Sequence, residues 1–285
     1  MGKKEVTMNM RSREYNRGYA LCSVCIVFIL CFILAACATV PLTERKSLNL
    51  IPSSELLSLS DQQYAEVLRE SKLSTDRRQV QMVTRVGKRI AGAAEEFLRG
   101  TRAEKKLKNY QWEFNVIEDD KTANAWCMPG GKVAVYTGIL PFTRNEAGLA
   151  AVLGHEVAHA IAEHGNERMS EALLAQLGGV ALAVALEKEP EETRQLYMAA
   201  YGITANVAVL LPYSRLHESE ADRIGLTLMA KAGYDPHEAV RFWQTMSEKG
   251  GSRPPTFLST HPAPESRVEK IKSYIPEAMQ HYKKR

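Results

Sequence analysis

The hydrophobic and polar positions divide this chain of 285 residues into an apolar N-terminal run, a short region of alternation and a long series of helical patterns. The run Ala20–Ala36 is apolar except for Ser23. Apolar and polar residues alternate over Gln111–Glu118, which predicts a strand. Asn124–Met128 and Lys132–Thr137, on either side of the turn at Pro129-Gly130-Gly131, are expected to be two further strands. We expect these strands to form a small antiparallel sheet, with helices over most of the remaining chain.

The helical patterns predict a mostly α fold of the α+β class. Apolar residues recur at the 3.6-residue period of a helix, and Ser, Asp or Asn precedes several segments as a capping residue. The expected helices are residues 53–71, 74–98, 145–168, 172–186, 199–211, 217–232, 235–249 and 265–274. The segments 172–186 and 199–211 are apolar but too short to span a bilayer, so we expect buried core helices. A hairpin that touches a membrane surface or covers the site is the alternative.

Residues 1–36 have the features of a signal peptide. A basic, polar start precedes the apolar run, and small residues close it. The sequence Leu34-Ala35-Ala36-Cys37 resembles the lipobox of bacterial lipoproteins, in which the cysteine is acylated and becomes the first mature residue. An uncleaved membrane anchor is the alternative, since an apolar run of this length just suffices to span a bilayer.

The lipobox predicts how the whole chain is organised. Residues 1–36 are the signal peptide, 37–52 an extended lipidated tether and 53–285 one folded domain. Because a basic flank stays in the cytoplasm, the folded domain is placed at the periplasmic face of a membrane of the cell envelope, anchored through Cys37. Ala38 stands where an aspartate would favour the inner membrane, so the outer membrane is expected.

The charge and cysteine distributions argue against two other classes of protein. The formal net charge is +4, but most of it lies in residues 1–36. The body has no basic stripe with interleaved aromatic residues, so no nucleic-acid binding is expected. Cys127 is the single cysteine after Cys37. It is expected to be a small buried residue of a strand, with no partner for a disulfide and no cysteine-based zinc site.

The run His155-Glu156-Val157-Ala158-His159 carries the clearest chemistry in the chain. Histidines four residues apart lie on one face of a helix, about one turn from each other, and can converge on one Zn²⁺. Glu156 stands beside the first histidine, where a carboxylate can take a proton from an attacking water. This spacing predicts a zinc hydrolase with one zinc ion per chain.

A third ligand is expected from a second helix. Glu218 and Asp222 share one face, so Glu218 can bind the metal while Asp222 orients a ligand imidazole. Glu220 points elsewhere on the same helix. Glu163 is too far along the first helix to reach the same ion as His155, and His164 is expected to be a polar residue near the end of that helix.

The two motifs together resemble the gluzincin family of zinc metallopeptidases that includes the HtpX heat-shock protease, the CAAX prenyl protease and the Oma-type mitochondrial protease. The resemblance extends to the segments Asn124–Gly138 and Ser259–Pro262, with Arg267, and covers roughly residues 53–275. The lipobox points to the bacterial periplasmic lipoprotein branch, similar to the LoiP-type and YcaL-type proteases. The family resemblance implies a minimal gluzincin core, with the active-site helix packed on the small sheet.

The resemblance also implies roles for individual residues. His155, His159 and Glu218 are the expected zinc ligands, Glu156 the general base and Asp222 the partner of a ligand histidine. The expected substrates are polypeptides in extended form, such as misfolded envelope proteins. We expect them to pair with the strand residues Val133, Ala134 and Val135.

His261 has two interpretations from the sequence. It reaches the open zinc position, as an inhibitory ligand or a donor to the transition state, or it is a loop residue beside the core. Two other functions stay open with it. One is a zinc-containing periplasmic chaperone or assembly factor that binds partners with little proteolysis. The other is a purely structural zinc site, for which His261 is the candidate fourth ligand.

Overall fold

The computed structural model describes residues 37–204, 211–249, 255–262 and 265–282, so the expected signal peptide lies outside the described residues. The strands are β1 (Cys37–Thr39), β2 (Lys46–Leu48), β3 (Glu113–Ile117), β4 (Ala125–Met128) and β5 (Lys132–Tyr136). The α-helices are α2 (Ser53–Glu70), α3 (Arg77–Leu98), α4 (Leu140–Thr143), α5 (Glu146–Ile161), α6 (His164–Ala185), α7 (Glu191–Thr204), α8 (Leu211–Lys231), α9 (His237–Lys249), α10 (Thr256–Thr260) and α11 (Glu265–Met279). Two 3₁₀ helices are η1 (Glu104–Asn109) and η2 (Thr137–Ile139). The expectation of a mostly helical α+β fold is confirmed.

The sheet of β3, β4 and β5 is mixed rather than antiparallel. Its order is β3-β5-β4, and β5 runs parallel to β3 and antiparallel to β4. Alternation in the sequence locates strands but does not determine their neighbours, because the short turn at Pro129–Gly131 joins β4 to β5 while β3 takes the other side of β5. The central strand is therefore β5, and β4 forms an edge.

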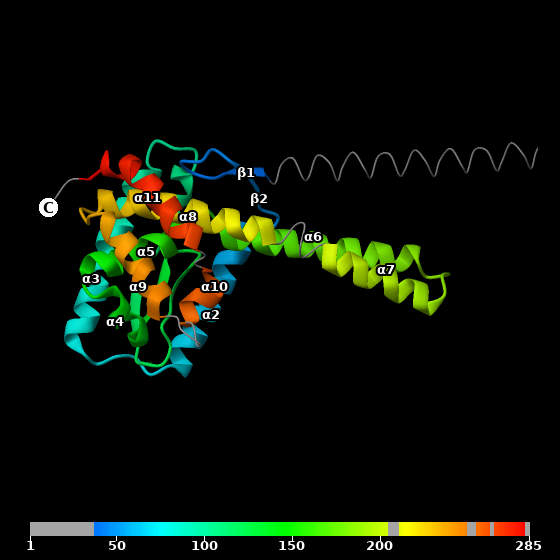
Figure 1. Cartoon of the computed structure of the whole chain (residues 1–285), viewed down its shortest axis with the longest axis horizontal. Helices are drawn as coiled ribbons and strands as arrows, with labels where there is room; N and C mark the ends of the chain where they lie inside the picture. Colours follow the sequence, from blue (N-terminus) through cyan, green and yellow to red (C-terminus); the bar gives the residue numbers. More distant parts are fainter. Residues whose placement is uncertain (1–36, 205–210, 250–254, 263–264, 283–285) are drawn as a thin grey trace, which may run out of the picture.

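Helix α5 lies at the centre of the helical layer and packs against β4, α3, α8 and α9 (Figure 1). Asn145 caps it by accepting a hydrogen bond from the Gly148 N–H at 2.8 Å, as expected. Residues 148–161 are all buried, so α5 is a core helix. Its contact with α8 is close because Gly154 faces Gly225 there.

The helix expected to continue to Arg168 breaks at Glu163. Glu163 adopts the left-handed conformation (φ 59°), which ends α5 and lets α6 start in a new direction. Its carboxylate is held in this turn by Asn49 Nδ2 at 2.6 Å and Lys106 Nζ at 2.5 Å. A non-glycine residue in this region costs about 1 kcal/mol or more, which contacts distant in the sequence offset here.

Helices α6 and α7 form an arm that projects from the bundle (Figure 1). Tyr201 joins them by donating to the Ala175 carbonyl at 2.7 Å, beside Gly178, where a side chain would collide with the Tyr201 hydroxyl. The expectation of buried core helices is wrong for this part of the chain. The exposed apolar side chains of the arm include Leu173, Leu177, Val180, Val184, Leu196 and Tyr197. None of the described helices is both long and apolar enough to cross a bilayer.

Residues 37–52 are docked on the body and do not form a free tether. Strands β1 and β2 pair as an antiparallel hairpin, and Val40 is buried in the main core. The backbone beyond β2 continues along α6, where Leu50 N–H donates to Ser170 Oγ at 2.9 Å and Ile51 N–H to Asn166 Oδ1 at 3.3 Å. The two prolines in this stretch indicated an extended chain, but the contacts that hold it come from α6 and α8.

Candidate metal centre

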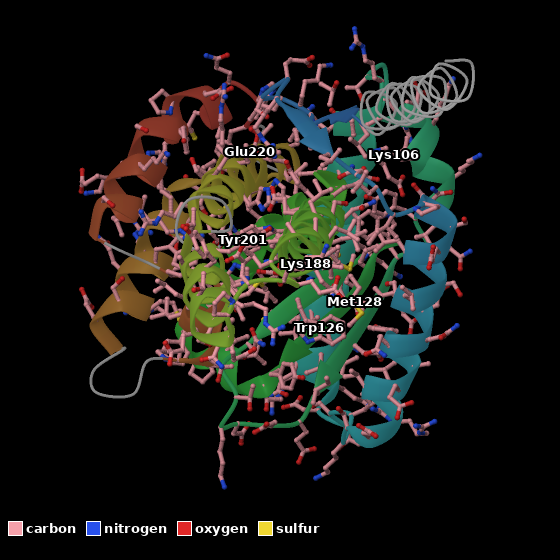
Figure 2. The ribbon with its side chains drawn as sticks, turned by 90° about the vertical axis from the view of Figure 1, so that its right-hand side faces the viewer. Lys106, Trp126, Met128, Lys188, Tyr201 and Glu220 are labelled. Atoms are coloured by element: carbon pink, nitrogen blue, oxygen red, sulfur yellow. The ribbon has the colours of Figure 1, made fainter. Side chains whose placement is uncertain are left out.

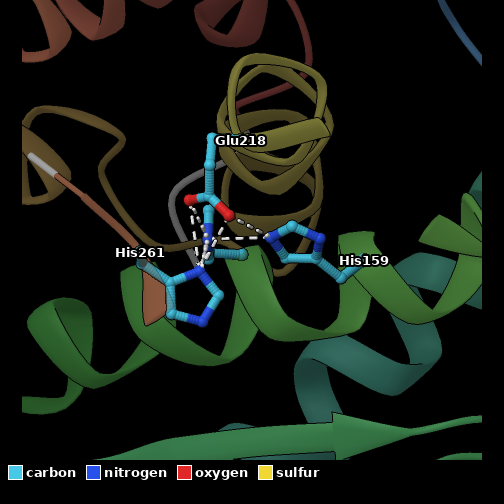
Figure 3. Close-up of side chains that lie close together, drawn as sticks. His159, Glu218 and His261 are labelled. Atoms are coloured by element: carbon cyan, nitrogen blue, oxygen red, sulfur yellow. Dashed lines mark hydrogen bonds and ion pairs between the residues drawn. The ribbon is translucent and has the colours of Figure 1, made fainter. Parts of the chain in front are cut away.

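Four side chains from three helical segments converge on one buried point. His155 and His159 come from α5, Glu218 from α8, and His261 from the residue that ends α10. One ligand atom from each lies within 4.8 Å of all the others, as Figure 3 shows for His159, Glu218 and His261. The predicted pair on α5 and the predicted carboxylate on α8 are thus brought together, and His261 joins them.

The separations between these atoms fit a tetrahedral zinc ion. His155 Nε2 lies 3.1 Å from His159 Nε2 and 3.1 Å from His261 Nδ1. Glu218 oxygens lie 3.0 Å from His261 Nδ1 and 3.3 Å from His159 Nε2. Ligands about 2.0–2.1 Å from a tetrahedral zinc are roughly 3.3 Å from one another. Imidazole and carboxylate are also donors that zinc prefers.

The local charge fits a divalent cation as well. Glu156, Glu218 and Asp222 are all buried, and the guanidinium of Arg267 is buried among them. With neutral histidines, three carboxylates and one guanidinium leave two negative charges in a low-dielectric site, which a divalent ion would balance.

Asp222 occupies the expected position behind a histidine of the cluster. Its Oδ1 lies 3.0 Å from His155 Nδ1, on the opposite side of the ring from the cluster. Arg267 binds both oxygens of the same carboxylate, at 2.9 and 2.8 Å, and its Nη1 lies 3.0 Å from Glu218 Oε2. Stacking of the Arg267 guanidinium over Trp243, 3.6 Å from the ring centroid, fixes this geometry.

The pKa directions describe how the metal-free cluster holds protons. Burial lowers the pKa of His159 well below its usual value, which leaves it neutral. Burial acts the same way on His155, but the carboxylates of Asp222 and Glu218 outweigh it and raise that pKa to about 9. The pKa of Glu218 lies far below its usual value, because hydrogen bonds to the histidines outweigh its burial. A proton on a ligand histidine competes with a metal for the ring nitrogen.

Glu156 lies next to the cluster but outside it. Its side chain is buried, and burial raises the pKa of the carboxyl. Oε1 accepts no hydrogen bond from any described residue and lies 3.4 Å from His261 Nε2. A buried carboxylate oxygen without a hydrogen-bond donor is costly, and a water bound there would supply one. The position suits a general base.

His261 is held in place from behind. Phe257, on α10, is fully buried, and its ring centroid lies 4.6 Å from that of His261. The Phe257 N–H donates to the Ala123 carbonyl at 2.9 Å, which ties α10 to the segment that leads into β4. The structure thus places His261 Nδ1 within the cluster, beside His155 and Glu218.

The predicted substrate strand does not fit its role. Val133, Ala134 and Val135 lie on the central strand β5, which pairs with β3 on one side and β4 on the other. They are fully buried, and both edges of their backbone are already used. No described strand pairs with the outer edge of β4, so an added strand would dock there instead.

Two buried residues near the cluster have contacts that the sequence did not indicate. His164 was expected to be an ordinary polar residue, yet it is fully buried with Nδ1 2.9 Å from His159 Nδ1. Glu220 does point away from the cluster, but it is buried against His164 and not in solvent. The turn at Glu163 places His164 there, and no helical periodicity predicts that turn.

Comparison with known proteins places this cluster in a defined family. The profile of peptidase family M48 matches residues 80–275. The mitochondrial metalloendopeptidase OMA1 of Schizosaccharomyces pombe is 34% identical over 244 residues, which cover 84% of this chain and 66% of the relative. The human metalloendopeptidase OMA1 is 30% identical over 289 aligned residues, which cover 97% of this chain and 53% of the human protein.

A bacterial relative also matches the central part of the chain. The β-barrel assembly-enhancing protease of Escherichia coli K12 is 31% identical over 170 residues, which cover 55% of this chain and 33% of that protein. The chain thus spans between a third and two thirds of the length of these three relatives. Because the family profile covers more than half of the chain, including all four members of the cluster, the chain belongs to peptidase family M48.

Proposed function

We propose that this chain is a zinc-dependent endopeptidase. The observation that carries the proposal is the buried carboxylate of Glu156 beside four tetrahedrally spaced donors. Bound by His155, His159 and Glu218, zinc would activate water and polarise the scissile carbonyl. Glu156 takes the proton of the attacking water and passes it to the leaving amine. Asp222 holds His155 in the tautomer that directs Nε2 to the cluster.

The substrate is an extended polypeptide that pairs with the outer edge of β4. Trp126 and Met128 on this strand are partly exposed (Figure 2). A cavity of about 230 Å³ lies where the end of β4 meets His159, and it is large enough for an apolar side chain. Leu56, Leu57, Tyr110, Cys127 and Met128 are among the residues that line it. Main-chain pairing favours unfolded segments over particular sequences.

The protein acts in the cell envelope, anchored through acylated Cys37 at the periplasmic face of the outer membrane, on misfolded or unassembled envelope proteins. The lipobox supports this location, and one relative is named for β-barrel assembly. Replacing Cys37 with Ser should move the protein from the membrane fraction to the soluble fraction. Retention of the variant in the membrane would instead indicate the uncleaved anchor.

The activity is tested with Glu156→Gln on a labelled unfolded protein. Gln keeps the shape of Glu but cannot take a proton, so we expect zinc content to stay the same while cleavage falls by roughly 10²–10⁴-fold. Glu146→Gln is the matched control, since Glu146 lies on the same helix but is partly exposed and pairs with Arg85. Cleavage by zinc-loaded Glu156→Gln at the wild-type rate would refute the proposed role. The same variant, expressed in its own envelope, should trap the natural substrates.

The second candidate function is a zinc-containing chaperone or assembly factor with little proteolysis. It is favoured by His261 Nδ1, which stands at the fourth tetrahedral position, where a hydrolase needs an open site. If Glu156→Gln restores function in cells that lack the protein, binding and not cleavage is what the cell requires. We favour the protease, because a binding protein has no need of a buried carboxylate at that position.

A further inference from the structure

A chain of buried polar groups leads away from the metal centre. His164 Nδ1 lies 2.9 Å from His159 Nδ1, and His164 Nε2 lies 3.3 Å from Glu220 Oε2. Glu220 in turn accepts hydrogen bonds from Arg45 Nε at 2.9 Å and Thr43 Oγ1 at 2.6 Å. All members except the two hairpin residues are at least 90% buried. These hydrogen bonds therefore connect a candidate metal ligand with the N-terminal hairpin.

The hydrogen bonds from His159 through His164 to Glu220 each have one direction if a metal is bound. His159 presents Nε2 to the cluster, so its Nδ1 carries the proton and donates to His164 Nδ1. Neutral His164 then carries its own proton on Nε2 and donates to Glu220. Burial lowers the pKa of His164 to about 4, which agrees with a neutral ring at pH 7. The carboxylate at the end sets the tautomers of both histidines.

Arg45 also supports this series of hydrogen bonds through a second carboxylate, that of Glu167. Its Nη1 and Nη2 bind the two oxygens of Glu167 at 2.6 and 2.7 Å. Glu167 accepts a further bond from His217 Nε2 at 2.9 Å. The ring of His217 stacks on that of His164, with 4.4 Å between the centroids. Arg45 thus connects the start of α6, which carries His164, with the part of α8 that carries Glu218 and Glu220.

The hairpin is shaped to present these two side chains. Leu42 and Glu44 both have positive φ angles, 70° and 53°. These alternate with Thr43 and Arg45, whose side chains reach Glu220 beside the hairpin (Figure 2). Two non-glycine residues with positive φ cost of the order of 1 kcal/mol each, so this turn persists because its contacts with the body compensate.

We propose that Arg45 and Thr43 are positioning residues, which hold His159 through Glu220 and His164, so that docking of the hairpin sets the metal affinity of the site. The proposal rests on the zinc site proposed above. The hairpin begins at Cys37, the expected lipid attachment point, so the state of the anchor and the state of the metal site are coupled. Undocking of the hairpin frees the ring of His159 to rotate and weakens metal binding.

The test measures zinc affinity by competition with a chelator and records the visible spectrum of the Co²⁺-loaded protein, with the full chain in detergent. Arg45→Met keeps the unbranched apolar stem of the side chain and removes its donors. We expect a changed Co²⁺ spectrum and a loss of zinc affinity of up to about 10-fold, the lower end of the range for direct partners of metal ligands, because Glu220 and His164 stand between Arg45 and His159. Arg45→Lys should recover part of the affinity. Arg85→Met, on the exposed surface of α3, should change neither.

A double-mutant cycle separates transmission through His164 from general destabilisation. His164→Phe keeps the ring stacked on His217 and removes both nitrogens. If the chain transmits the effect, Arg45→Met causes no further loss of zinc affinity in the His164→Phe background. Additive losses, or folded Arg45→Met with wild-type affinity and spectrum, would overturn the proposal. Thr43→Val provides the milder variant if Arg45→Met does not fold, and it should lower the affinity in wild type but not in His164→Phe. Absence of zinc binding by the wild-type chain would instead refute the proposed function.

Discussion

Gly154 of α5 faces Gly225 of α8 so closely that a Cβ atom on Gly154 would lie 2.9 Å from the Gly225 carbonyl oxygen. The obstacle is backbone and cannot rotate away. A Cβ on Gly225 would in turn lie 2.9 Å from the backbone nitrogen of His155. The two helices that supply His155, His159 and Glu218 are therefore in backbone contact next to the cluster.

Gly154→Ala should separate α5 from α8. We expect a loss of roughly 1–3 kcal/mol in the free energy of unfolding, because the backbone must shift to admit the methyl group. Zinc affinity should fall at least tenfold, since the two histidines of α5 move away from Glu218 of α8. Gly92→Ala on α3 is the control, because nothing lies within 4 Å of a Cβ there. It should stabilise the protein by up to about 1 kcal/mol. Equal unfolding curves for both variants would show that the contact is not critical.

His261→Ala should lower zinc affinity and raise peptide hydrolysis. The change removes the fourth donor and leaves three ligands with an open position for water. Hydrolysis is compared at saturating zinc, so that weaker binding does not hide a faster reaction. A decrease in hydrolysis would assign His261 to the transition state instead. Unchanged kinetics would remove it from the mechanism.

Asp222→Asn should reduce zinc affinity by about 10–100-fold while the fold persists. The amide cannot serve as the anionic acceptor for His155 Nδ1, and Arg267 loses its bidentate partner. Asp61→Asn on the exposed face of α2 is the matched control, because its carboxylate is 64% exposed. Titration with zinc measures the zinc affinity of both variants. Equal affinities would show that His155 is oriented by other contacts.

The hairpin contacts should make stability depend on pH in the acid range. Burial acts to raise the pKa of Glu220, but hydrogen bonds from His164 and Arg45 outweigh it and lower the pKa to about 2. Its contribution is therefore complete above the unfolded-state pKa near 4.3 and is lost as pH falls towards 2. Glu220→Gln should cost roughly 1–3 kcal/mol in urea unfolding at pH 7. The difference in the free energy of unfolding between wild type and Glu220→Gln should shrink from about pH 5 downward. A difference that stays constant over this range would contradict the lowered pKa of Glu220.

The sequence predicted the parts of the site that depend on helical spacing alone. Residues four apart on a helix lie on one face in any fold, which is why His155 with His159, and Glu218 with Asp222, came together as expected. The position of His261 followed from resemblance and not from spacing. The structure places its Nδ1 in the cluster, and its role is left to the His261→Ala variant.

Features that depend on contacts between distant segments were not predictable. The break at Glu163 is stabilised by Asn49 and Lys106, which are far away in the sequence. Without that break, His164 cannot be placed behind His159. The choice of β5 as substrate strand failed for a similar reason, because alternation does not show which strand of a sheet lies at the edge.

The arm of α6 and α7 separates α5 from α8 in the sequence but not in space. Its entropic cost is that of closing a loop, which grows only with the logarithm of length, at about 0.6 kcal/mol per doubling. Residues beyond the buried start of α6 can thus be lengthened or shortened at little thermodynamic cost to the metal centre. This makes the arm the place where the chain can be redesigned, or fused to another module, while the chemistry of His155 and Glu218 is kept.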